Sequence, residues 1–138
     1  VRAADFKSQE LASIVWALAT VRLRHVALFR SVSSGASSSM KQFDPHALSD
    51  LAWACARLSF HDPDLFLRLS EEIVRRSEQL KPQDISTIVW SCATLNVDDP
   101  RLVRILSSEA LEKLSTFDPQ DLSNLAWGFT AFDATGFE

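Results

Sequence analysis

Apolar residues recur along this chain at helical spacing, in two blocks per repeating unit. In residues 43–79 the first block forms a stripe made of Leu48, Leu51, Ala52, Cys55 and Leu58. The second block forms another stripe, made of Leu65, Phe66, Leu69 and Ile73. Apolar positions separated by three and four residues are typical of amphipathic helices. The pattern therefore predicts two helices joined by a turn, the first about 14 residues long.

Capping residues mark where these helices begin. Asp44 precedes Pro45 and Asp62 precedes Pro63. Aspartate at the N-cap, followed by proline at the first helical position, is a favourable helix start. Related pairs recur at Lys81-Pro82, Asp99-Pro100 and Asp118-Pro119. Each unit is therefore predicted to be a helix-turn-helix hairpin.

The hairpins repeat with a fixed period. Intervals of 37 residues separate the only tryptophans, Trp16, Trp53, Trp90 and Trp127. A fixed period of this size is the signature of a stacked array. We predict an all-α, right-handed α-solenoid of seven helices, forming a single segment over residues 1–138 with a 37-residue period. The repeats cover about residues 6–42, 43–79 and 80–116, with a half repeat at 117–132.

The first repeat and the two ends depart from the regular plan. The serine-rich residues 31–39 predict a short or frayed helix, or a loop, and are also a candidate phosphorylation target. Unpaired repeats normally need polar caps. We therefore expect apolar surface at both ends of the array. We also expect the chain to be a fragment of a longer protein that continues there, or to be covered there by protein partners.

The periodic tryptophans have two interpretations. Small residues accompany them, namely Ala12, Ala19, Ala56 and Ala93, and would leave room for an indole between helices. This favours a structural role, with every tryptophan substantially buried and with Trp53 and Trp90 the most enclosed. The alternative is that exposed indoles stack on nucleic-acid bases. An identical residue in every copy favours packing over sequence-selective contact.

One position in the first helix of each unit is always polar but varies between copies: Ser13, Asp50, Thr87 and Asn124. Helical projection places it on a face with positions 9, 46, 83 and 120, positions 17, 54, 91 and 128, and positions 20, 57, 94 and 131. Such a face can form the concave binding surface of an array, and its varying side chains could read one RNA base per repeat. The alternative is an ordinary solvated helix face. The acidic residues Glu10, Asp50, Asp84 and Asp121 would repel phosphates.

Charge is distributed unevenly along the chain. Residues 1–41 carry six basic and two acidic side chains, a net +4, whereas the remainder is −8 and the whole chain is −4. Phosphate contact requires a basic footprint. The candidates for it are Lys7, Arg22, Arg24 and Arg30. The alternative is that these side chains only make a turn soluble.

Other classes of function find no support in the sequence. There is no apolar run long enough to span a membrane. The residues His25, His46 and His61 lie in different settings, and the chain has three glycines and no phosphate-binding loop. We therefore expect no catalytic residue, no cofactor, no metal site and no small-molecule substrate. Cys55 and Cys92 are expected to be reduced core residues.

The core pattern F-x-P-Q-[DE]-[LI], followed by the tryptophan, resembles the heptatricopeptide repeat. It is also similar to the octotricopeptide repeat and to the helical arrays of FAST-kinase-like mitochondrial proteins. The best copies are residues 80–95 and 117–132, and the resemblance covers residues 6–132. It implies an organellar RNA-binding protein, mitochondrial or plastid, which acts on single-stranded or ribosomal RNA in processing, stability, translation or ribosome assembly. Such proteins often carry a RAP domain, for which no segment here is suitable.

A second function remains open at this point, namely a protein–protein interaction scaffold within a larger assembly. The acidic balance of residues 42–138 favours this alternative.

Overall fold

All regular structure in the part of the chain that the computed structural model describes, residues 7–22 and 25–134, is helical. Its seven α-helices are α1 (Ser8–Thr20), α2 (Val26–Ser38), α3 (Pro45–Arg57), α4 (Pro63–Arg75), α5 (Pro82–Thr94), α6 (Pro100–Glu112) and α7 (Pro119–Ala134). Short 3₁₀ helices precede three of them: η2 (Met40–Gln42), η3 (Ser77–Gln79) and η4 (Leu114–Thr116). The all-α prediction is confirmed for these residues.

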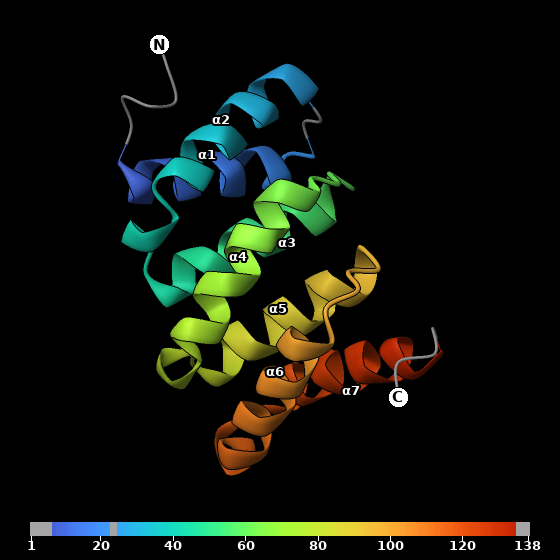
Figure 1. Ribbon diagram of the computed structural model, residues 1–138. Coiled ribbons are helices and arrows are strands. Elements are labelled where there is room, and N and C mark those ends of the chain that lie inside the picture. The colour runs from blue at the N-terminus through green and yellow to red at the C-terminus, as the bar shows by residue number, and fades with distance from the viewer. Residues whose placement is uncertain (1–6, 23–24, 135–138) are drawn as a thin grey trace.

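The helices form two layers that extend from α1 and α2 at one end to α7 at the other (Figure 1). In the first layer α1 packs on α3, α3 on α5, and α5 on α7, while α2, α4 and α6 form the second layer. The hydroxyl of Ser8 donates to the carbonyl of Gln42, and that of Ser86 donates to the carbonyl of Asp121. These bonds join the N-terminal ends of successive first-layer helices, which therefore run parallel. The packing is consistent with a solenoid.

The predicted helix starts are confirmed in detail. The carboxylate of Asp44 accepts a hydrogen bond from the Ala47 amide at 2.7 Å. Asp62 and Asp99 accept the amides of Leu65 and Leu102 in the same way, both at 3.1 Å. Because the cap satisfies an amide that the first helical turn leaves free, each Asp-Pro pair fixes where a helix begins.

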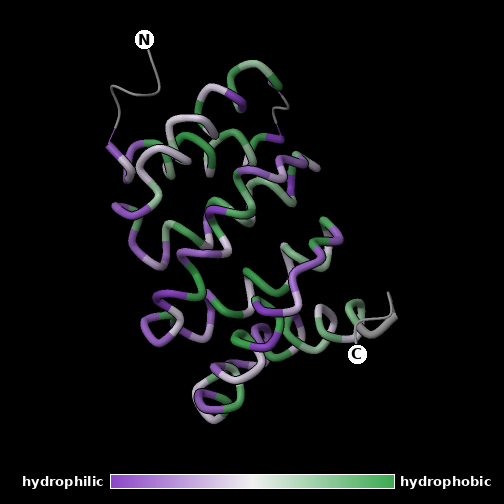
Figure 2. Tube along the Cα trace, in the orientation of Figure 1, coloured by the Kyte–Doolittle hydropathy of each residue, from purple (hydrophilic) through white to green (hydrophobic). Residues whose placement is uncertain are grey.

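The predicted apolar stripes form the core. Apolar and polar residues alternate along each helix at helical spacing (Figure 2). All nine stripe residues of the second repeat are buried: Leu48, Leu51, Ala52, Cys55, Leu58, Leu65, Phe66, Leu69 and Ile73. Both cysteines are buried and free, as expected. Burial raises the pKa of the Cys92 thiol to about 12, which keeps it protonated and unreactive at neutral pH.

The prediction of a short helix or loop at residues 31–39 is wrong. The serine-rich helix α2 has 13 residues, as many as α4 and α6. Phe29, Val32 and Ala36 are buried on its inner side. The hydroxyl of Ser33 donates to the carboxylate of Asp62 at 3.0 Å. Packing against α4 therefore outweighs the weak helix propensity of serine and glycine, since tertiary contacts supply most helical stability.

Among the described residues, one at positive φ lies in each turn inside a hairpin: Arg22 at 55°, Ser59 at 52° and Asn96 at 54°. A side chain with a Cβ is disfavoured there, least so for asparagine. We expect Ser59→Gly to raise the free energy of unfolding by about 0.5–1 kcal/mol, after allowance for the greater unfolded-state entropy of glycine. Denaturant unfolding of Ser59→Gly beside Asn96→Gly measures this. A stability gain at residue 96 equal to that at residue 59 would contradict the argument.

The array ends expose apolar side chains, as predicted. Leu122 of α7 is 38% exposed, whereas its equivalents Leu11, Leu48 and Ile85 are at most 1% exposed because the next first-layer helix covers them. At the other end Val21 is 69% exposed. Both end helices therefore present surface of the kind that is buried inside the array.

Candidate nucleic-acid interface

One face of every first-layer helix is open to solvent. It is formed by four positions at offsets of 0, 4, 7 and 11 residues, which fall within about 60° of one another on a helix. We call these positions the polar–aromatic face: Gln9, Ser13, Trp16, Thr20; His46, Asp50, Trp53, Arg57; Gln83, Thr87, Trp90, Thr94; and Gln120, Asn124, Trp127, Ala131. Each of these side chains is exposed or half-buried. Because the first-layer helices are parallel, the face continues across all four.

The predicted varying residues Ser13, Asp50, Thr87 and Asn124 all lie on this face, and Ser13 is exposed. The expectation for a neighbouring position holds only at Ala17, which is exposed. Ala54, Ser91 and Gly128 were expected to share the open face, but all three are buried. These small residues face the preceding first-layer helix: a Cβ at Gly128 would meet Val89 of α5. The row of small residues therefore serves close helix packing and belongs to no binding surface.

The tryptophans are more exposed than predicted. Trp16 and Trp127 are 49% and 50% exposed, so the expectation that all four are substantially buried is wrong. Trp53 and Trp90 are half-buried and are the more enclosed pair, as expected. The physical reason lies in the helical period, because each indole follows the first position of the face (Gln9, His46, Gln83 or Gln120) by seven residues, which is nearly two turns. The sequence contained this signal.

A groove runs along the face between α1 and α3. Gln9, Ser13 and Trp16 line it from α1, and His46 and Asp50 line it from α3. Further along the layer, the rings of Trp90 and Trp127 pack with centroids 6.5 Å apart and planes at 38°. The face thus combines aromatic surface with amide, hydroxyl and carboxylate groups.

A buried carboxylate stabilises the edge of this face. Asp84 is 2% exposed. Its Oδ1 lies 3.0 Å from His46 Nδ1 and 3.2 Å from Ser49 Oγ, and its Oδ2 accepts the Lys81 amide at 3.1 Å. The hydrogen bond to Asp84 raises the pKa of the His46 imidazole above its ordinary value, and burial raises the pKa of Asp50 beside it. The negative charge that Asp84 was expected to present to phosphates is therefore enclosed in an α3–α5 contact.

The candidate basic residues do not form one patch. Lys7 precedes α1 and Arg22 follows it, so a helix of 13 residues separates them. Arg30 lies on α2 in the second layer, where it lines a serine-rich groove with Arg68 of α4. Arg24 lies outside the described residues. Arg57, which helical projection placed on the open face but which was not among the basic candidates, ends α3 and belongs to the polar–aromatic face.

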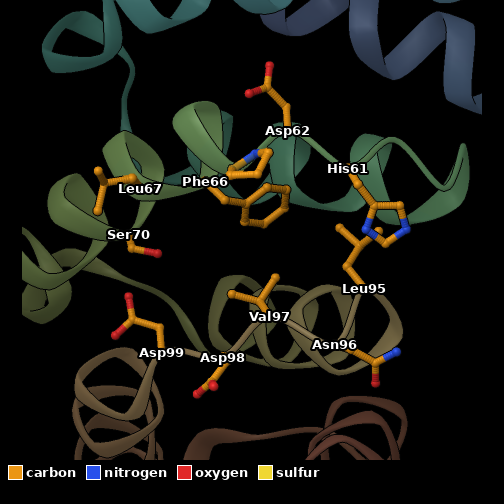
Figure 3. A pocket seen from close by; sticks show the side chains of 11 residues that line it. His61, Asp62, Phe66, Leu67, Ser70, Leu95, Asn96, Val97, Asp98 and Asp99 are labelled. Atoms are coloured by element: carbon orange, nitrogen blue, oxygen red, sulfur yellow. The ribbon is translucent and has the colours of Figure 1, made fainter.

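A separate cavity of about 330 Å³ lies between the start of α4 and the turn from α5 to α6 (Figure 3). Phe66 and Val97 line it from opposite sides. Asp62 and Asp99 also line it, and their carboxylates accept helix-start amides. Since this cavity lies between two hairpins and not on the polar–aromatic face, the candidate interface does not include it.

The residues that the structure describes contain no cluster of histidine, cysteine, aspartate and glutamate side chains arranged to hold a metal ion. None of their helices has the length and apolar character that crossing a membrane requires.

Comparison with known proteins identifies a family. The protein-family model described as "RESC6: RNA-editing substrate-binding complex 6 protein" matches residues 1–136. This is a different family from the heptatricopeptide, octotricopeptide and RAP groups that the repeat pattern resembles. No curated protein matches the chain.

Proposed function

Because this chain belongs to the family of RNA-editing substrate-binding complex 6 proteins, we propose that it is an RNA-binding helical-repeat protein that acts in organellar RNA processing within such a complex. The observation that carries this proposal is the family match, whose description names a complex that binds RNA-editing substrates. The polar–aromatic face is the proposed contact surface. Its side chains at Ser13, Thr87 and Asn124 are the proposed source of base selectivity, with Asp50 as the acidic member of the set.

The composition of the face agrees with contact through bases. Single-stranded RNA is recognised by stacking on aromatic side chains and by hydrogen bonds to base edges. The face contains four indoles but only one carboxylate, Asp50, and one guanidinium, Arg57. Phosphate attraction therefore contributes little at its centre. The additional phosphate contacts that we propose come from Lys7 and Arg22 at the two ends of α1, and from Arg30 on α2, outside the face.

Several finer features complete the proposal. The hairpins form a right-handed array with a 37-residue period, as in the repeats that the sequence resembles. The proposed compartment is the mitochondrion, because proteins of RNA-editing complexes are mitochondrial. The family match gives no reason to propose the plastid. The proposed role is binding and not catalysis, since the three histidines lie in separate settings and the sequence has no glycine-rich phosphate-binding loop.

A protein scaffold is the second candidate function. The apolar end face of α7, where Leu122 is exposed, favours it. So does the net charge of −8 after residue 41. Both observations fit contacts with other subunits of an assembly.

Filter binding of short single-stranded RNAs across a salt series separates these candidates. We expect the protein to retain RNA on the filter at low salt, and the binding constant to fall only gradually as salt rises, because few cationic side chains surround the face. Arg22→Ala should weaken binding to all RNAs alike and reduce the salt slope by about 1. The pair Thr87→Ala and Asn124→Ala should change the preference among RNAs while the slope stays constant. If the parent protein retains no RNA at low salt, the RNA-binding proposal fails and the scaffold is favoured.

A further inference from the structure

We propose that the four tryptophans of the polar–aromatic face are stacking platforms for the bases of single-stranded RNA, one base per repeat. This inference rests on the proposed RNA-binding function and names the side chains that carry it. Each platform consists of one indole and the varying polar residue three positions before it: Ser13 with Trp16, Asp50 with Trp53, Thr87 with Trp90, and Asn124 with Trp127.

The exposure of the indoles is the first observation that carries it. Trp16 and Trp127 leave half of their surface in water. This is not only an end effect, because Trp53 and Trp90 have first-layer helices on both sides and pack partly against the core, yet they too are not fully buried. A large aromatic side chain normally gains stability by burial. Four such side chains on one open face therefore point to a ligand with flat π surfaces.

The neighbours of the indoles are the second observation. A residue and the one three positions later lie side by side on a helix. Each indole is therefore next to a side chain that can donate or accept a hydrogen bond. In the groove between α1 and α3 these groups converge, since Trp16 and Ser13 line it together with His46 and Asp50. A base stacked on Trp16 would have its edge within reach of these polar groups.

The spacing between repeats also suits successive nucleotides. The ring centroids of Trp90 and Trp127 are 6.5 Å apart. Stacked bases lie about 3.4 Å apart along a strand, so this separation is roughly twice the stacking distance. Bases on neighbouring indoles would be splayed from one another, which is how proteins read single-stranded RNA.

Fluorescence gives a direct readout of this arrangement. The chain has four tryptophans and no tyrosine, so its intrinsic near-ultraviolet emission comes from these four indoles. The probes are short oligo(A), oligo(U) and oligo(C) RNAs, together with an abasic ribose-phosphate strand of equal length. We expect the three RNAs to quench the emission and the abasic strand, which keeps the phosphates, to leave it unchanged.

Paired variants then test the indoles themselves. Trp16→Ala and Trp127→Ala should each weaken RNA binding about tenfold, the scale of one stacked base. The corresponding phenylalanine variants should recover part of that loss, because they keep an aromatic face. The control is Leu67→Ala with Leu111→Ala, which truncates apolar side chains that are 57% and 72% exposed on the second layer. RNA affinity should be unchanged in this control.

The outcomes separate the inference from the function on which it rests. If the tryptophan variants keep the circular dichroism and thermal unfolding of the parent and bind RNA as tightly, base stacking is wrong while RNA binding stands. The same holds if the abasic strand binds as tightly as the RNAs. If the parent binds none of the RNAs, or if only a protein partner shields the indoles, both proposals are overturned.

Discussion

Asp84→Ala is expected to lower the free energy of unfolding by about 2–4 kcal/mol, although no ligand contact is assigned to this residue. Its carboxylate is buried between α3 and α5 and interacts with His46, Ser49 and the Lys81 amide. Removing it leaves that amide without its partner at the start of α5 and opens a small void. The contribution of His46 is discounted, because that side chain is 63% exposed and water can replace the lost contact.

The repeat provides a matched control for this variant. Asp121 occupies the same position at the start of α7 but is only half-buried. Asp121→Ala should therefore change stability by no more than about 0.5 kcal/mol. Asp84→Asn keeps the shape and one acceptor, so its loss should be intermediate. Denaturant unfolding followed by circular dichroism measures all three. Equal losses of unfolding free energy at residues 84 and 121 would show that burial of the Asp84 hydrogen bonds adds nothing to stability.

Local features of the fold could be predicted from sequence, because they depend on near neighbours in the chain. Asp44 caps α3 with an amide only three residues away, and the Leu48 stripe is buried because apolar residues at helical spacing must cover one side of a helix. The prediction of a short helix or loop at the serine-rich α2 was wrong for the opposite reason. Its stability depends on Phe29 and Ser33 meeting α4, and propensity contains no information about that contact.

The candidate site was predictable only in part. The varying residues, from Ser13 to Asn124, were found because helical projection places them on one face. The same projection places Trp16 beside Ser13, but the hydrophobicity of an indole favoured a buried assignment, and the structure corrects it. The enclosure of Asp84 needs His46 of the preceding repeat. The other repeats have glutamine at the position of His46, so the repeat pattern gave no sign of the contact.

Gly128→Leu is expected to separate α7 from α5, at a loss of about 3 kcal/mol or more. Even a Cβ at this position would meet the Val89 side chain and would lie 3.3 Å from the Val89 carbonyl carbon and oxygen. Valine in a helix has one strongly preferred rotamer, so it cannot turn away without cost, and the Val89 backbone can be relieved only if the two helices move apart. The higher helix propensity of leucine, about 1 kcal/mol over glycine, does not offset this clash.

Ala17→Leu is the matched control, because Ala17 has the same repeat position on α1 but is exposed. Leucine at residue 17 should change the free energy of unfolding by no more than about 0.5 kcal/mol. Since α7 ends the described array, its loss can be local. Amide hydrogen exchange in residues 119–132 should therefore accelerate in Gly128→Leu and remain at the parent rate in Ala17→Leu. Slow exchange in both variants would mean that α7 tolerates a wider spacing from α5. The row of small residues would then not be what sets the approach of first-layer helices.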